Sequence, residues 1–113
     1  MTKQPEKLDI SALKNALAQL QTSHQRTLEA RAGKEAHNYA LFRAATIQAF
    51  EYSYELSVKM MQRCIEMYGA TEEEAPRRFT DFLRVASEYH LIDEPLEWEE
   101  YRKARNKTSH TYN

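Results

Sequence analysis

An arginine and a histidine near the end of the 113-residue chain are of the types that phosphodiester cleavage uses. Arg105 and His110 are five residues apart, which is about 140° around a helix. An imidazole titrates near neutrality, so it can take the proton of an RNA 2′-hydroxyl or protonate the leaving oxygen. A guanidinium matches phosphate oxygens and can stabilise the charge that develops on them. The spacing alone is not specific, because such a pair occurs by chance in many helices.

Other polar side chains surround this pair. Asn106 is four residues before His110 on the same helix face, where it can orient the imidazole or bind phosphate. Arg102, Lys107 and Ser109 are expected to support the site or to bind RNA, although surface lysines often serve only solubility. Glu55, further back in the chain, could hydrogen-bond Arg105 or His110, with a solvated position as an equal alternative. We expect this chemistry to need no metal and no cofactor.

The charges of the chain balance overall but are segregated near its end. There are 16 basic and 17 acidic residues, so the whole molecule has no strong field that would attract nucleic acid or membranes. Residues 93–100 carry five carboxylates and no cation, whereas residues 101–113 carry four cations and no carboxylate. Matching of the helix macrodipole, with acids in the first turns and bases in the last, is the simplest explanation of this division. It does not explain the reactive residue types in the basic half.

The elements that must position these residues are helices. Only 2 glycines and 3 prolines are present, too few for the sharp reversals of a sandwich or a barrel. The expected fold is all-α, an antiparallel up-and-down bundle of four helices in a single domain over residues 1–113. One cysteine excludes an intramolecular disulfide and a cysteine-based zinc cage. The polar start and the absence of a long apolar run favour a cytoplasmic protein that does not enter membranes.

Each helix has recognisable limits. The first is expected to be capped by Asp9 or Ser11 and to end near Gly33, with Ile10, Leu13, Leu17, Leu20 and Leu28 on one stripe. The second is expected over 38–68, ending at Gly69, and the third to open at Pro76 after the acidic link 72–74. The third has Phe79, Phe82, Leu83, Ala86 and Tyr89 on one face. Asp93 with Pro95 predicts the start of the fourth.

Several residues have packing as their simplest interpretation. The second helix would be about 45 Å long, so one flank is expected to meet another chain. Its sulfur-containing residues, Met60, Met61, Cys64 and Met67, favour adaptable packing in a core or dimer interface. In the fourth helix a stripe through Trp98, Tyr101, Arg105, Thr108 and Tyr112 predicts that Arg105 lies at the margin of the packed face. The remaining histidines, His24, His37 and His90, have no metal-ligand spacing and are expected at the surface or the core edge.

The segment 101–112, with sequence YRKARNKTSHTY, resembles the C-terminal signature of HEPN proteins, in which an Arg, a polar residue and three further residues are followed by His-x-Tyr. More narrowly, it is similar to the subfamily encoded beside a minimal nucleotidyltransferase, labelled nucleotidyltransferase substrate-binding proteins and regarded as toxins of toxin-antitoxin pairs. Residues 50–61 and 81–86 are similar to the second and third helices of that subfamily. The resemblance covers most of the chain from about Phe50 onward.

The resemblance implies a helical homodimer that brings two copies of the motif into one cleft. It implies metal-independent endoribonuclease activity, with Arg105, Asn106 and His110 at the matching catalytic positions. The implied partner is a nucleotidyltransferase antitoxin that can transfer AMP to the Tyr of His-x-Tyr, here Tyr112. The sequence ends one residue after Tyr112, where the family usually continues into a further helix. The expectation is therefore a last helix that is truncated, frayed or completed by a partner.

Two other functions fit the same features. The chain could be a non-catalytic module that presents a substrate or nucleotide to a separate nucleotidyltransferase. It could also be a structural helical dimer whose motif has decayed. A neighbouring nucleotidyltransferase gene would favour the ribonuclease or the binding module, and its absence would favour the structural dimer.

Overall fold

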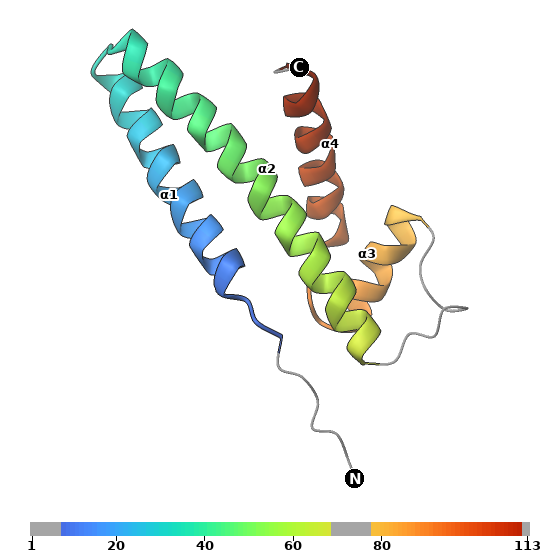
Figure 1. The fold of residues 1–113 in the computed structure, drawn as a ribbon. Coiled ribbons are helices and arrows are strands. Elements are labelled where there is room, and N and C mark those ends of the chain that lie inside the picture. Colours follow the sequence, from blue (N-terminus) through green and yellow to red (C-terminus); the bar gives the residue numbers. More distant parts are fainter. Residues whose placement is uncertain (1–7, 69–77, 112–113) are drawn as a thin grey trace. The chain divides into compact units, whose positions relative to one another are not determined.

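The computed structural model describes residues 8–68 and 78–111, and these form helices and connections without any strand (Figure 1). The helices are α1 (Ser11–Ala32), α2 (Ala36–Met67), α3 (Phe79–Glu88) and α4 (Pro95–Thr111). The predicted all-α fold class is therefore confirmed. The second helix agrees with its predicted limits to within two residues at its start and one at its end. Gly69, the link 72–74 and Pro76 lie outside the described residues. The predicted opening of the third helix at Pro76 is wrong, because Arg78 is extended and α3 begins at Phe79.

The chain divides into two compact units. The N-terminal unit, Ile10–Ser57, contains α1 and most of α2, and the C-terminal unit contains the rest of α2 from Val58 onward with α3 and α4. Within the N-terminal unit, α1 and α2 run antiparallel side by side (Figure 1). That arrangement agrees with the short connection between them. The assignment of residues 1–113 to a single domain stays a prediction.

The residues of α1 that are buried are small. They are Ala16, Thr27 and Ala30, whereas Leu17 and Leu28 of the predicted leucine stripe are 47% and 45% exposed. The leucine stripe is therefore not the most buried line of this helix. Small residues allow two helices to approach closely, and the longer leucines are left along the flanks of that contact line.

A pair of threonine hydroxyls joins α1 to α2. The Oγ1 atoms of Thr27 and Thr46 are 3.0 Å apart, and each also lies close to a carbonyl oxygen of its own helix, that of Ser23 at 2.7 Å and that of Phe42 at 2.8 Å. Each hydroxyl has one proton to donate, so the two threonines have two protons for these three contacts.

Replacing Thr27 by valine is expected to lower the free energy of unfolding by about 1 kcal/mol, because it removes the hydroxyl and keeps the shape. Urea denaturation followed by circular dichroism would measure this loss. Thr46→Val should cost less in the Thr27→Val background than alone, since the shared contact is already absent. Thr22→Val, at an exposed position of α1, is the control. Equal costs of Thr46→Val in both backgrounds would contradict the interaction.

Helix ends in both units use a left-handed residue that is not glycine. Lys34 follows α1 with φ of 57°, and His90 follows α3 with φ of 61°. At each end a later backbone N–H donates to a carbonyl of the helix, from Glu35 to Ala30 at 3.0 Å and from Leu91 to Ala86 at 2.9 Å. The predicted end of the first helix near Gly33 is confirmed. The predicted cap at Asp9 or Ser11 is wrong, because Ile10 occupies the cap position and no side-chain hydrogen bond caps the helix there.

The core of the C-terminal unit lies between the end of α2, α3 and the approach to α4. Its buried members, here called the core cluster, are Met61, Ile65, Phe82, Leu83, Ala86 and Ile92. Val58, Phe79, Val85 and Trp98 pack against the core cluster. The predicted apolar face of the third helix is confirmed for Phe82, Leu83 and Ala86, whereas Tyr89 is 41% exposed. The predicted packing role of the sulfur-containing residues is confirmed for Met61, with Met60, Cys64 and Met67 half-buried.

None of the helices formed by the described residues is both long and apolar enough to cross a membrane.

Candidate functional site

One continuous helix carries most of the predicted site residues. Helix α4 starts at Pro95, as predicted, because a proline fits the first turn, where its missing N–H would have no helical partner. Residues 96–111 contain no further glycine or proline, so the helix continues through positions 102, 105, 106, 107, 109 and 110 (Figure 1). Position 110 lies within this helix, while the side chain of His110 and the whole of Tyr112 lie outside the described part of the structure.

Arg105 lies at the margin of the packed face of α4, as predicted. Its side chain is half-buried, and Thr108, one turn later, is half-buried as well and donates its hydroxyl to the Arg105 carbonyl oxygen at 2.9 Å. Trp98, on the same stripe, packs against the core cluster and meets the ring of Tyr101 edge to face at 5.3 Å. The backbone of Arg105 and the part of its side chain nearest the backbone are thus held on a packed helix face.

A depression of about 350 Å³ lies on the surface of α4. Four residues at three- and four-residue spacing line it: Glu99, Arg102, Lys103 and Asn106. The depression therefore includes two of the predicted site residues, Arg102 and Asn106. Lys103 pairs with Glu100 across one turn at 3.2 Å, and both side chains are largely exposed. This ion pair contributes little to stability, because water screens it.

Arg102 makes a contact that reaches outside α4. Its guanidinium carbon lies 4.8 Å from the centroid of the Phe79 ring, in the first turn of α3. Phe79 was predicted only as a core-facing residue, and Glu99 only as part of an acidic run. The spacing of residues 99, 102, 103 and 106 indicates a common face of the helix and is the signal for Glu99. Nothing local in the sequence indicates the contact of Phe79 with Arg102.

The predicted pairing of Glu55 with the motif stays a prediction. Glu55 is exposed and lies in the N-terminal unit, whereas Arg105 belongs to the C-terminal unit. Ser109 is half-buried on α4 and Lys107 is exposed. His24, His37 and His90 are all exposed, in agreement with their predicted surface positions. Within residues 8–68 and 78–111, no group of three His, Cys, Asp or Glu side chains is arranged to hold a metal ion.

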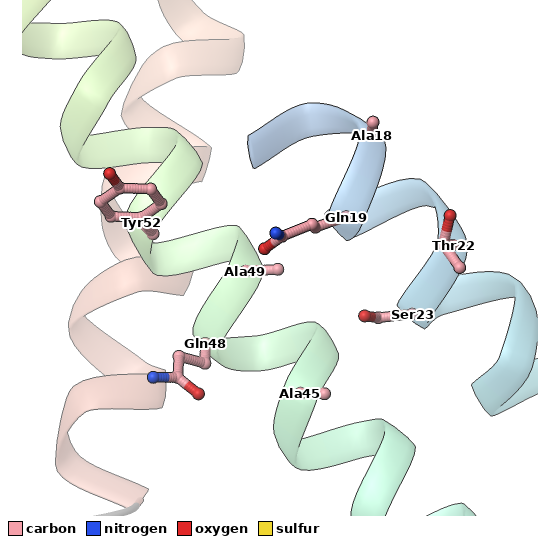
Figure 2. A pocket seen from close by; sticks show the side chains of 8 residues that line it. All are labelled: Ala18, Gln19, Thr22, Ser23, Ala45, Gln48, Ala49 and Tyr52. Carbon is pink, nitrogen blue, oxygen red and sulfur yellow. The ribbon is translucent and has the colours of Figure 1, made fainter. Parts of the chain in front are cut away.

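A second depression, of about 580 Å³, lies between α1 and α2 in the N-terminal unit (Figure 2). Gln19 and Ser23 of α1 point toward Ala45 and Ala49 of α2 across it (Figure 2). The full lining consists of Ala18, Gln19, Thr22, Ser23, Ala45, Gln48, Ala49 and Tyr52. None of these residues carries a charge at neutral pH. This depression therefore lacks the cation and the imidazole that phosphodiester chemistry needs.

Comparison with known proteins identifies the family. A family model described as nucleotidyltransferase substrate binding protein like matches residues 8–113. The chain therefore belongs to this HEPN-type family. A curated relative from Haemophilus influenzae, named probable ribonuclease HepT, is 44% identical over 70 residues, which is 61% of this chain and 48% of the relative. The chain thus spans about half the length of that relative. No solved structure matches the chain.

Proposed function

We propose that this chain is a metal-independent endoribonuclease of the HEPN toxin type, with its active site on α4. The observation that carries the proposal is the likeness to a protein named probable ribonuclease, at 44% identity over 70 residues. The structure adds that Arg105 is half-buried at the edge of a packed face of α4, and that the same helix carries a depression lined by Asn106. A guanidinium that is partly anchored on this helix suits the binding of an RNA phosphate.

In the proposed reaction, the imidazole of His110 takes the proton of an RNA 2′-hydroxyl. The 2′-oxygen forms a bond to the adjacent phosphorus, and the bond from phosphorus to the 5′-oxygen breaks. A protonated imidazole then supplies a proton to that oxygen, which leaves a 2′,3′-cyclic phosphate on one product and a 5′-hydroxyl on the other. The guanidinium of Arg105 stabilises the charge on the phosphate oxygens. In a homodimer with two motifs in one cleft, one His110 serves as the base and the other as the acid.

The other predicted site residues support this reaction. Asn106 orients the imidazole or binds phosphate, and Ser109 and Lys107 contact RNA. Incubating the purified chain with single-stranded RNA in the presence of EDTA tests the proposal. Cleavage under these conditions is expected. RNA that stays intact with and without added metal, at protein concentrations that saturate the RNA, would contradict the ribonuclease function.

The same proposal includes control by a nucleotidyltransferase partner in the cytoplasm. Transfer of AMP to Tyr112 would place a negative phosphodiester group seven residues after Arg105 in the sequence. This anion would pair with the cations of the motif and exclude RNA phosphate by charge and by bulk.

Incubation with the partner nucleotidyltransferase and ATP is expected to add one AMP to the chain and to abolish RNA cleavage. Intact-mass measurement detects the addition, and Tyr112→Phe should prevent it. Tyr101→Phe, at a partly exposed tyrosine of α4, is the matched control and should still accept AMP. Modification of the Tyr112→Phe variant at the wild-type rate would show that another residue is the acceptor.

A second candidate function is favoured by the description of the matching family as substrate binding. The chain would then present a substrate or nucleotide to a separate nucleotidyltransferase without cleaving RNA. This function is favoured if mutation of Arg105 abolishes binding of the partner but does not change RNA cleavage.

A further inference from the structure

The contact of Arg102 with Phe79 fixes a cation at the edge of the α4 depression. The ring of Phe79 packs against the core cluster and lies 5.9 Å from the ring of Phe82, which is buried. The position of the Phe79 ring is therefore set by the core, and Arg102, itself exposed, lies over it at 4.8 Å. A guanidinium over an aromatic ring gains a cation–π attraction that restrains a side chain with many rotamers.

The donors of Arg102 stay available for an anion. A guanidinium carries five N–H donors, more than a contact with one aromatic ring can use. Among the described residues, no carboxylate is within ion-pair distance of Arg102, whereas Arg26, Arg84 and Lys103 each pair with a glutamate on their own helix. Arg102 is thus a restrained cation, and no carboxylate of the described residues neutralises its charge by an ion pair.

The place of Arg102 on the helix lies within the proposed site. On an ideal helix it is about 60° from Arg105 and about 80° from position 110, within the arc that separates these two residues. It precedes Arg105 by three residues and position 110 by eight, which is about 12 Å along the axis. Arg102 is therefore too far along α4 to share one phosphate closely with His110. A phosphate that Arg102 binds is therefore a neighbour of the scissile phosphate in the RNA backbone.

We propose that Phe79 is a positioning residue for Arg102. Arg102 is then a second phosphate-binding cation, which binds single-stranded RNA at a phosphate next to the scissile one. The proposal rests on the proposed function for the identity of the anion. Asn106 extends the same depression toward position 110 and offers an amide to the same strand. Glu99 is half-buried in the depression and its carboxylate opposes an anion there, so Glu99→Gln should tighten RNA binding.

Binding of an uncleavable RNA tests this proposal directly. A fluorescent single-stranded oligonucleotide with 2′-O-methyl groups throughout has no 2′-hydroxyl to react, so anisotropy at several salt concentrations measures binding alone. Arg102→Gln is expected to weaken binding roughly tenfold, the effect of one charge-assisted hydrogen bond. It should also reduce the slope of log K against log salt by about 0.7, the value for one phosphate contact on a single strand. Both effects should be the same for RNAs of different sequence.

Matched variants separate positioning from a general loss of charge or stability. Arg84→Gln removes one cation from an exposed position of α3, where Arg84 pairs with Glu88 at 3.4 Å, and should change neither the affinity nor the slope. Phe79→Leu keeps an apolar side chain against the core cluster but removes the ring, and should weaken binding by a few-fold. Phe79→Tyr restores the ring and should restore the affinity. In cleavage assays, Phe79→Leu should raise KM more than it lowers kcat.

The outcomes distinguish this proposal from the proposed function. If the wild-type chain cleaves RNA but Arg102→Gln keeps the affinity and the slope of the wild type, the phosphate contact is overturned and the ribonuclease function stands. If Arg102→Gln lowers the slope but no RNA is ever cleaved, the phosphate contact stands and the ribonuclease function fails. If the wild-type chain does not bind the oligonucleotide even at low salt, both are overturned.

Discussion

Replacing His110 by alanine is expected to reduce the rate of RNA cleavage by about 10²–10⁴-fold, the usual contribution of a positioned acid or base. The loss should be near the upper end of that range, because the proposed dimer uses two imidazoles and the substitution removes both. Single-turnover cleavage of a labelled RNA in EDTA measures it. The variant should still bind the 2′-O-methyl oligonucleotide, since the guanidiniums that contact phosphate are retained.

A matched histidine makes this result specific. His24 is exposed on α1 and lies outside the segment 101–112 that carries the proposed catalytic residues, so His24→Ala should leave the cleavage rate unchanged. Circular dichroism should show the same helix content for both variants, because alanine is the best helix former. Equal cleavage by the His110→Ala variant and the wild type would remove His110 from the mechanism.

Truncating Leu83 is expected to have the largest effect on folding. Leu83 is 1% exposed and belongs to the core cluster that packs α3 against the end of α2. Leu83→Ala should lower the free energy of unfolding by about 2–5 kcal/mol, from lost apolar burial and the cavity that remains. Total stabilities are only about 5–15 kcal/mol, so this is a large share. Urea denaturation measured by circular dichroism gives the value.

The control for this prediction is a leucine on α4. Leu96 is 69% exposed, so Leu96→Ala should change the free energy of unfolding by less than about 0.5 kcal/mol. Leu83→Ala should also weaken RNA binding before global unfolding, because Phe79 packs against the same cluster and supports Arg102. A cost of Leu83→Ala as small as that of Leu96→Ala would contradict the assignment of this core.

Helix existence and the buried face of α3 were predictable because they depend on local patterns. Scarcity of glycine and proline indicates long helices, and the spacing of Phe82, Leu83 and Ala86 indicates one face. The N-terminal end of α1 was predicted wrongly, because Asp9 and Ser11 are good capping residues on propensity alone. The small residues at the line of contact between α1 and α2 were also missed. Hydrophobic spacing favours leucines there, whereas close helix approach favours alanine and threonine.

The predicted site was accessible from the sequence only in part. The place of Arg105 at the margin of a packed face follows from its spacing from Trp98 and Thr108. The contact between Phe79 and Arg102 joins two helices, and no local pattern encodes a contact between distant segments. It depends on how the core cluster orients α3. The pairing of Glu55 is likewise a long-range relation, and it stays a prediction.

The most direct test of the central claim is the chemical identity of the RNA ends that the purified chain produces in EDTA. Mass spectrometry of the fragments should show a 2′,3′-cyclic phosphate on one side of each cut and a 5′-hydroxyl on the other, and the His110→Ala variant should produce far fewer fragments in the same time. Fragments that carry a 5′-phosphate and a 3′-hydroxyl would contradict the account, because such ends arise from attack by water and not by the RNA 2′-oxygen.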